Sequence, residues 1–190
     1  MLTMLREKIG ALMAKKDRVI VAIDGSCTAG KTTLARWLQQ QYGGVVIPMD
    51  DFFLRGEQRT PERFAQPGGN VDYERFREEV LHPLMAGETF AYRPYNCKIA
   101  ALDTPRMVEP ARLVIVEGTY SLHPAFGEIY DLKVFLEVDR ETRRRRILQR
   151  PAALHRRFFE EWIPMEQLYF ECCAVPERCD LVLTLPPMEE

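Results

Sequence analysis

The chain has 190 residues, 46% of them hydrophobic, which is long enough for one well-buried domain and short for two. Its formal net charge of -2 excludes a global positive field that would hold the protein on nucleic acid or on an anionic membrane. The five cysteines are an odd number without a paired framework, so we expect a single cytoplasmic domain over residues 1–190 with neither nucleic acid nor membrane as a partner.

The first 13 residues carry apolar side chains at positions 2, 5, 9, 12 and 13, a helical spacing and not the apolar core of a signal sequence. Five short runs rich in Val, Ile and Leu follow, at 19–23, 45–49, 112–116, 133–138 and 181–185. Helical patterns lie between them, at 31–42, 72–86, 140–150 and 158–173. This alternation predicts an α/β fold in three layers, with a central five-stranded parallel sheet and helices on both faces.

A glycine-rich loop directly follows the first apolar run. It has the pattern G-x-x-x-x-G-K-[ST], is followed by Thr33, and reads Gly25-Ser26-Cys27-Thr28-Ala29-Gly30-Lys31-Thr32. Glycines let the backbone curl so that successive N–H groups point at phosphate oxygens, while Lys31 supplies a mobile cation and Thr32 a hydroxyl for Mg²⁺. Because a strand precedes it and a helix follows it, the loop predicts a nucleotide triphosphate site over 25–33 in preference to a chance glycine-rich turn.

Two carboxylates, Asp50 and Asp51, follow the second apolar run. Ligands of parallel sheets collect at the carboxyl ends of the strands, so these residues are expected at the same edge as the glycine-rich loop. Phosphoryl transfer to a hydroxyl needs one carboxylate to orient and deprotonate the acceptor. We predict that Asp50 is this base and that Asp51 contacts the acceptor; the alternative is a helix cap.

Glu117 ends the third apolar run and is followed by Gly118. This is the layout of a Walker B carboxylate, in which a strand beside the glycine-rich loop ends in an acid that reaches Mg²⁺ directly or through water. The alternative is a surface glutamate at a strand end. The position favours a metal role, so we predict Thr32 and Glu117 as the metal ligands.

The only dense basic region begins at residue 143. At 3.6 residues per turn, Arg143, Arg146 and Arg150 fall on one side of the helix predicted after the fourth apolar run. An arginine run alone is usually a solvated helix face. If this stripe faces the phosphates, it neutralises the charge that develops during transfer, which makes Arg143 and Arg146 catalytic candidates and Arg150 a nucleotide-binding candidate.

Together these residues resemble the uridine kinase and phosphoribulokinase superfamily of P-loop kinases, which includes nicotinamide riboside kinases and a type of pantothenate kinase. The motifs are Met49-Asp50-Asp51-Phe52-Phe53, similar to the family's Asp-x-Phe segment, and Ile115-Val116-Glu117-Gly118, similar to its Glu-Gly motif. Residues 162–165 further resemble the region after the lid in nicotinamide riboside kinases. The resemblance implies a P-loop NTPase fold with a small substrate hairpin near 90–110 and an arginine-bearing lid near 143–160.

The resemblance also implies roles for residues at the acceptor side. Asp72 matches the start of the segment whose aspartate holds ribose hydroxyls in uridine kinases, and Tyr95 of the hairpin is a candidate to stack on a base, although such a tyrosine is about as often packing. This hairpin has Asn96 where uridine kinases carry an aspartate, and it lacks the histidine that reads the pyrimidine.

The leading hypothesis is an ATP- and Mg²⁺-dependent kinase of a small-molecule hydroxyl, with the 5′-hydroxyl of a nucleoside as the first choice and nicotinamide riboside or pantothenate as alternatives. A GTPase-type switch needs Asp-x-x-Gly and Asn-Lys-x-Asp elements, and the chain has neither. An inactive ATP-binding regulator is a third hypothesis. The sequence leaves open ATP versus GTP as donor and whether the protein forms a homo-oligomer.

Overall fold

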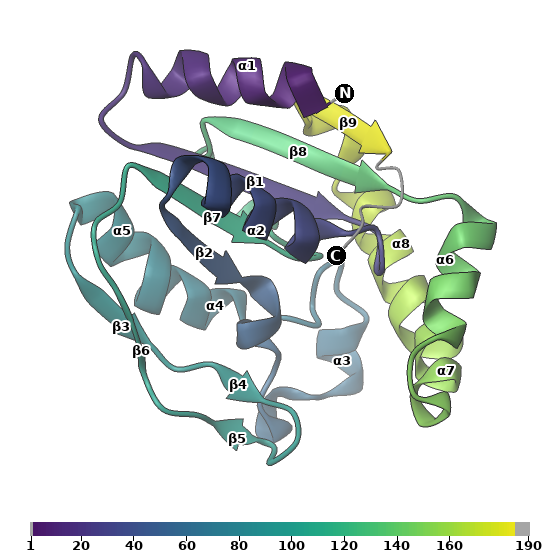
Figure 1. Ribbon diagram of the computed structural model, residues 1–190. Helices are drawn as coiled ribbons and strands as arrows, with labels where there is room; N and C mark the ends of the chain where they lie inside the picture. The colour runs from purple at the N-terminus through teal and green to yellow at the C-terminus, as the bar shows by residue number, and fades with distance from the viewer. Residues whose placement is uncertain (1, 185–190) are drawn as a thin grey trace.

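Five parallel strands form the central sheet, in the spatial order β2-β7-β1-β8-β9 (Figure 1). In chain order they are β1 Val19–Gly25, β2 Val45–Pro48, β7 Leu113–Glu117, β8 Leu132–Glu137 and β9 Leu181–Thr184. The computed structural model describes residues 2–184, so residue 185, the predicted end of the last strand, lies outside it. The sheet confirms the predicted α/β fold, because each apolar run forms a parallel strand close to its expected bounds.

Helices cover both faces of this sheet, which gives the three predicted layers (Figure 1). One face carries α1 Leu2–Met13 and α2 Lys31–Tyr42, and the other carries α4 Tyr73–Phe76, α5 His82–Ala86 and α8 Ile163–Cys172. The shorter elements are η1 Met49–Phe52, η2 Gly56–Gln58, α3 Pro61–Phe64, η4 Pro124–Phe126 and η6 Pro176–Arg178. Within residues 2–184, no helix combines the length and the apolar composition needed to cross a bilayer.

Strand β1 lies at the centre of the sheet and is buried on both sides. Side chains of a strand alternate between its faces, so Val21 and Ile23 pack with α1 and α2, whereas Ile20 and Ala22 pack with the helices of the opposite face. Because side chains on both faces of such a strand are buried, the run 19–23 is apolar throughout and shows no alternation.

The helical segments 73–86 and 152–172 each contain a π-helical turn that ends shortly before a proline. The turn η3 Arg77–Leu81 precedes Pro83, and the turn η5 Phe158–Trp162 precedes Pro164. Inside an α-helix, proline has no N–H to donate and its ring clashes with the carbonyl four residues earlier. A π turn changes the hydrogen-bond spacing at that point, so the helix can continue past the proline. The segment 73–86 is therefore helical throughout, as predicted.

The lid region differs from the prediction in its boundaries. Helix α6 Arg140–Leu148 stops two residues short of the expected end, and a further helix, α7 Ala152–Arg157, runs on through η5 into α8. The predicted helix over 158–173 thus begins at residue 152. Pro151 explains the break, because proline disfavours helical backbone in the residue before it, and Pro151 itself stands with non-helical backbone at the N-cap of α7.

The predicted excursion over 90–110 consists of two small antiparallel ladders. Strands β3 Phe90–Tyr92 and β6 Arg106–Val108 pair near the sheet, and β4 Tyr95–Asn96 pairs with β5 Ala101–Leu102 at the tip. In Figure 1 this hairpin extends below β2, away from the central sheet. It therefore forms a separate arm beside the carboxyl end of β2.

Candidate active site

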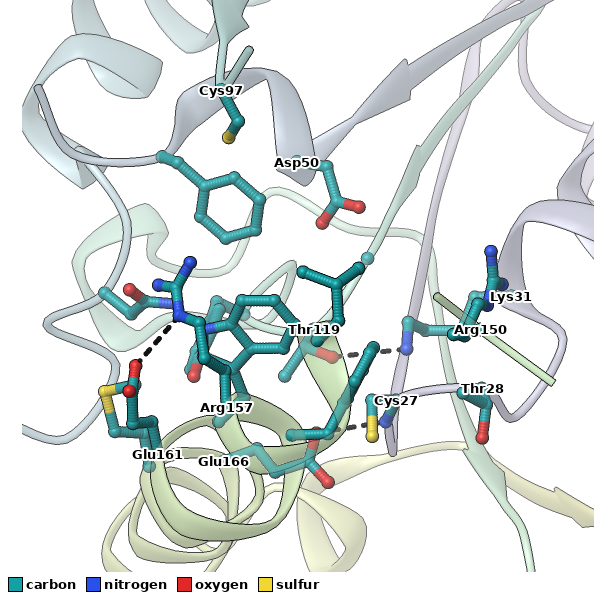
Figure 2. A pocket seen from close by; sticks show the side chains of 18 of the residues that line it. Cys27, Thr28, Lys31, Asp50, Cys97, Thr119, Arg150, Arg157, Glu161 and Glu166 are labelled. Carbon is teal, nitrogen blue, oxygen red and sulfur yellow. Dashed lines mark hydrogen bonds and ion pairs between the residues drawn. The ribbon is translucent and has the colours of Figure 1, made fainter. Parts of the chain in front are cut away.

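The carboxyl ends of β1, β2 and β7 open into a cleft of about 1600 Å³. In the strand register, Ile23 of β1 and Pro48 of β2 both lie opposite Glu117 of β7. The segments that follow these three strands therefore start at one level of the sheet edge, where ligands of parallel sheets bind. The walls of the cleft are the glycine-rich loop, the turn after β2, the hairpin tip and the helices of the lid (Figure 2).

The glycine-rich loop runs from the end of β1 into α2 through backbone conformations that favour glycine. Gly25 has a φ of +137°, and a Cβ there would lie 2.2 Å from the carbonyl oxygen of Leu136. Gly30, with a φ of +98°, stands directly before the first turn of α2. Thr28 has a φ of +61°, which is strained for a β-branched residue. The loop thus curls ahead of a helix N-terminus, the arrangement that suits phosphate.

Lys31 turns its side chain back over this loop. Its Nζ donates to the carbonyl oxygens of Gly25 and Ser26, both at 2.9 Å, and to Thr119 Oγ1 at 3.2 Å (Figure 2). Burial lowers the pKa of Lys31, while the carboxylates around it raise the pKa. The ammonium group therefore rests on loop carbonyls, inside the same loop whose N–H groups suit phosphate oxygens.

Thr32 and Glu117 meet at the edge of the loop. Thr32 Oγ1 donates to Glu117 Oε1 at 3.0 Å, and burial raises the pKa of Glu117 against the opposing effect of that hydrogen bond. Gly118 is required after the glutamate, because a Cβ there would lie 2.7 Å from Cβ of Met49. A hydroxyl and a carboxylate at one point are oxygen ligands of the kind that Mg²⁺ takes, so the pair fits the metal.

Asp50 lies in the short turn η1 and points into the cleft (Figure 2). Its residue is exposed to the cleft, and among the described residues its carboxylate has no hydrogen-bond partner. The cap position of this turn belongs to Pro48, so Asp50 does not act as a helix cap. Desolvation raises the pKa of Asp50, although the charge of Lys31 lowers it. The carboxylate is therefore free to accept a proton from a molecule in the cleft.

Asp51 does not line the cleft, and we revise its predicted contact with the acceptor. Its Oδ2 accepts hydrogen bonds from Tyr92 Oη at 2.9 Å and from Arg106 Nη1 at 2.7 Å, and its carbonyl accepts from Arg75 at 2.9 Å. Both side-chain partners belong to the hairpin strands. Asp51 thus anchors the hairpin to the turn that carries Asp50.

Asp72 is buried and lies outside the cleft wall. It caps α4 by accepting a hydrogen bond of 3.1 Å from the backbone of Arg75. Its other oxygen lies 3.6 Å from Arg75 Nε and 3.7 Å from Arg55 Nε, and the residue is 1% exposed. The structure thus places Asp72 as a buried helix cap, apart from the residues that line the cleft, and the sugar contact implied by the resemblance stays a prediction.

Tyr95 does line the cleft, although most of its surface is buried. The guanidinium of Arg59 lies over its ring, 5.3 Å from the centroid. Five more aromatic side chains line the cleft: Phe53, Phe64, Tyr120, Phe158 and Trp162. We call the part of the cleft that these side chains line, at the hairpin tip and at η5, the aromatic pocket.

The predicted arginine stripe faces the glycine-rich loop, but its members differ. Arg146 lines the cleft and donates to the carbonyl of Thr28 at 2.8 Å, and Arg150 also lines the cleft. Arg143 is absent from the cleft wall; its guanidinium contacts Cys27 Sγ at 3.4 Å instead. The geometry thus supports Arg146 and Arg150 as phosphate-side residues and places Arg143 beside the loop.

Comparison with known proteins assigns the family. The family model described as Phosphoribulokinase / Uridine kinase family matches residues 20–157. The chain belongs to this family. The chain is 28% identical over 156 residues to a phosphoribulokinase of Synechocystis sp.. This alignment covers 76% of the chain and 46% of the relative. The chain is 27% identical over 138 residues to a uridine kinase of Clostridium perfringens, covering 67% of this chain and 65% of the relative.

This family member therefore spans about half to two thirds of the length of these curated relatives. Its fold is that of a solved structure of a possible uridine kinase from Bacillus stearothermophilus, with a TM-score of 0.70 at 21% sequence identity. The alignment covers 94% of this chain and 98% of that chain. The P-loop kinase fold predicted from the sequence is confirmed.

Asp24, near the end of β1, was not among the predicted site residues. In this member of the family its two oxygens accept hydrogen bonds from the backbones of Gly25, Tyr120 and Leu122 and from the hydroxyl of Tyr169 at 2.8 Å. The residue is fully buried, and burial raises its pKa against the effect of these bonds. Asp24 therefore joins β1, the exit of β7 and α8 behind the phosphate loop.

Two further residues near the loop were missed. Thr119 follows the Glu-Gly pair, and its hydroxyl contacts Lys31 and donates to the carbonyl of Gly25 at 3.0 Å. Glu166 of α8 is buried, and it lines the cleft beside Cys27. No motif marks either residue; the one available signal was a lone acid at 166 in an apolar helical stretch that ends at Tyr169 and Phe170.

Proposed function

We propose that the protein is an ATP-dependent kinase that transfers the γ-phosphoryl group to a hydroxyl of a small molecule, with residues 1–190 acting as one kinase domain. The observation that carries this proposal is the position of Asp50: an unpartnered carboxylate points into the cleft next to the phosphate loop and the Thr32–Glu117 pair. A switch protein has no need of a base at this position, whereas transfer to a hydroxyl does.

In the proposed reaction, the N–H groups of the phosphate loop and the ammonium of Lys31 bind the β- and γ-phosphates. Bound Mg²⁺, held through Thr32 and Glu117, supplies charge neutralisation at the transferred group. Asp50 orients the acceptor hydroxyl and takes its proton as the acceptor oxygen bonds to the γ-phosphorus, while the bond from that phosphorus to the bridging oxygen breaks and ADP leaves. Arg146 and Arg150, on the cleft wall, stabilise the charge on the phosphates.

For the acceptor we propose a nucleoside that presents its 5′-hydroxyl to Asp50. The aromatic pocket around Tyr95 supports this choice, because the flat faces of its rings suit a planar base. The Clostridium perfringens relative carries the name uridine kinase, which agrees with a nucleoside. In this binding mode the base lies between the hairpin tip and the helix after the lid.

One observation favours a second candidate, an acceptor that already carries a phosphate. Arg59, Lys98 and Arg157 line the acceptor side of the cleft, and all three are exposed. Such cations suit an anionic group. The Synechocystis relative is named a phosphoribulokinase, and a phosphorylated sugar is accordingly the second acceptor class to test.

A coupled assay of ADP release tests the proposal. The purified protein is given Mg²⁺ with ATP or GTP and a panel of ribonucleosides, nicotinamide riboside, pantothenate and pentose phosphates. We expect one acceptor class to stimulate ADP release at least tenfold over the rate without acceptor, and Asp50→Asn to abolish the stimulation. A wild-type protein that binds ATP but responds to no acceptor would favour an inactive regulator instead.

A further inference from the structure

A buried carboxylate lies against the phosphate loop and comes from outside every predicted site. Glu166 of α8 is 2% exposed, and its Oε2 accepts a hydrogen bond of 3.0 Å from the backbone N–H of Cys27. Figure 2 shows this bond between the helix and the loop. A negative charge therefore sits within the loop that we propose to bind a triphosphate.

The same carboxylate is paired with an arginine of the lid. Glu166 Oε1 forms an ion pair with Arg143 Nη2, and Nε and Nη2 of Arg143 also donate to Cys27 Sγ, both at 3.4 Å. The side chains of Arg143 and Glu166 are only 13% and 3% exposed. Because Arg143 is not on the cleft wall, its charge is directed at Glu166 and not at the open space.

A second side chain of the same helix fixes Glu166 in place. Tyr169, three residues further along α8, donates to Asp24 Oδ2 at 2.8 Å. Residues three apart lie on one side of a helix, so α8 contacts the loop at its start through Tyr169 and at Cys27 through Glu166. The carboxylate therefore belongs to a built contact and not to a mobile surface pair.

The charge of Glu166 explains why an arginine is needed beside it. A bare carboxylate beside a bound triphosphate repels it, and like charges a few ångström apart in a partly buried site weaken binding by about 10- to 100-fold. A guanidinium on the carboxylate cancels this repulsion and leaves the other oxygen free to accept the N–H of Cys27.

We propose that Arg143 is the counter-charge of Glu166, and that the two form a positioning pair which holds the phosphate loop at Cys27 without repelling ATP. The proposal rests on the proposed ATP site. It gives Arg143 a task different from the direct phosphate contact predicted from the arginine stripe, because the guanidinium acts on the nucleotide only through Glu166.

The test is a double-mutant cycle on Mg-ATP binding, measured by titration calorimetry without any acceptor. We expect Arg143→Met to raise the Kd for ATP about 10- to 100-fold, because it leaves an unpaired carboxylate beside the triphosphate. Glu166→Gln changes the Kd less than about threefold, since the glutamine oxygen still accepts from Cys27. In the double variant the Kd returns to within about threefold of wild type, so that the second substitution rescues the first.

Two controls accompany the cycle. Glu171→Gln removes an exposed acid from the same helix and leaves the Kd unchanged. Thermal unfolding of each variant separates weakened ATP binding from loss of the fold. If Arg143→Met does not fold, Arg143→Lys replaces it: the Kd rises a few-fold in that variant, and adding Glu166→Gln lowers it again.

The outcomes are distinct. A double variant that binds ATP as weakly as Arg143→Met would mean that Arg143 contacts the phosphates directly, and the proposal is overturned. A Glu166→Gln variant as weak as Arg143→Met overturns it too, because the pair would then be a brace with no counter-charge effect. Wild-type protein that binds no Mg-ATP overturns the proposed function along with this inference, whereas binding without rescue overturns this inference alone.

Discussion

The two ends of the cleft are built in different ways. The phosphate end consists of the continuous stretch 25–33 and Glu117 on the neighbouring strand, and its binding groups are largely backbone N–H groups. The acceptor end takes its walls from η1, the hairpin and the helix after the lid, which lie far apart in the sequence. Local sequence therefore determines the phosphate end, and tertiary packing determines the acceptor end.

This difference also changes what polar residues do. At the phosphate end, Lys31 and Glu117 line the cleft; Asp50 of η1 also lines it, and its carboxylate has no hydrogen-bond partner among the described residues. At the acceptor end, Asp51 is hydrogen-bonded to the hairpin, and the buried Asp72 caps α4 beside two arginines. Variants at the two ends should therefore affect different kinetic constants, those of ATP and catalysis at one end and those of the acceptor at the other.

The largest effect is expected at Lys31. Lys31→Ala removes the cation of the phosphate loop and should lower kcat/KM for ATP by at least about 10³-fold, because charge on the transferring phosphate loses its fixed partner. Steady-state kinetics with varied ATP measures the change. Lys15→Ala, at an exposed position, is the control and should match wild type. A Lys31→Ala variant with near-normal ATP kinetics would contradict the proposed donor site.

The second-largest effect is expected for Asp50→Asn. This variant should lower kcat by about 10²-fold or more and leave ATP binding largely intact, because it loses only the positioned base. The matched control is Asp51→Asn, one residue along the chain, which should chiefly raise the KM for the acceptor. Initial rates and ATP calorimetry on both variants separate the two roles. A larger loss of kcat in Asp51→Asn would move the base to Asp51.

The pH dependence of activity gives a second test of Asp50 as the catalytic base. Burial raises the pKa of Asp50, so the base is protonated and inactive up to a pH above the ordinary aspartate value of about 3.9. Activity of the wild type should therefore rise with pH through this raised pKa, and Asp50→Asn should lack the step. The readout is kcat/KM for the acceptor over the acidic range. An identical step in the Asp50→Asn variant would assign the titration to another group.

At the acceptor end, Tyr95→Ala should raise the KM for the acceptor about tenfold while the KM for ATP stays constant, because the variant removes a ring from the aromatic pocket. Tyr95→Phe keeps the ring and should behave almost like wild type. Kinetics with the acceptor found in the screen measure both variants. An unchanged acceptor KM in Tyr95→Ala would show that the ring only packs.

The smallest effect is expected at the hairpin anchor. Tyr92→Phe deletes the hydrogen bond to Asp51 and should raise the KM for the acceptor about threefold, in line with the loss of one hydrogen bond. Thr89→Val deletes a similar bond, to Glu109, at the base of the hairpin and should leave that KM unchanged. Equal effects of the two variants would mean that the anchor to η1 has no special role.

The fold was predictable because its signals are local. Each strand of the sheet is an apolar run, and the glycine-rich loop is recognisable from eight consecutive residues. Glu117 and Asp50 could be placed at the cleft because parallel strands end at a common edge. These predictions needed no knowledge of side-chain packing.

The remaining residues depend on partners that the sequence does not reveal. Asp72 was expected to meet a sugar, but Arg55 and Arg75 lie beside it only after the chain folds. Glu166 lies 139 residues from Cys27 in the sequence, and no local pattern relates the two. The boundary of the lid helix was also misjudged, since the effect of Pro151 on its neighbours was not considered.

The bond between Tyr169 and Asp24 has a mechanical consequence. It fixes α8 to the end of β1, while the sheet itself fixes β8, and the lid helices α6 and α7 lie between these two points. The lid is thus a strap attached at both ends to the body that carries the phosphate loop. Any opening of this segment must take place between β8 and Tyr169, and it must break the contacts of Arg143 and Arg146 with the phosphate loop.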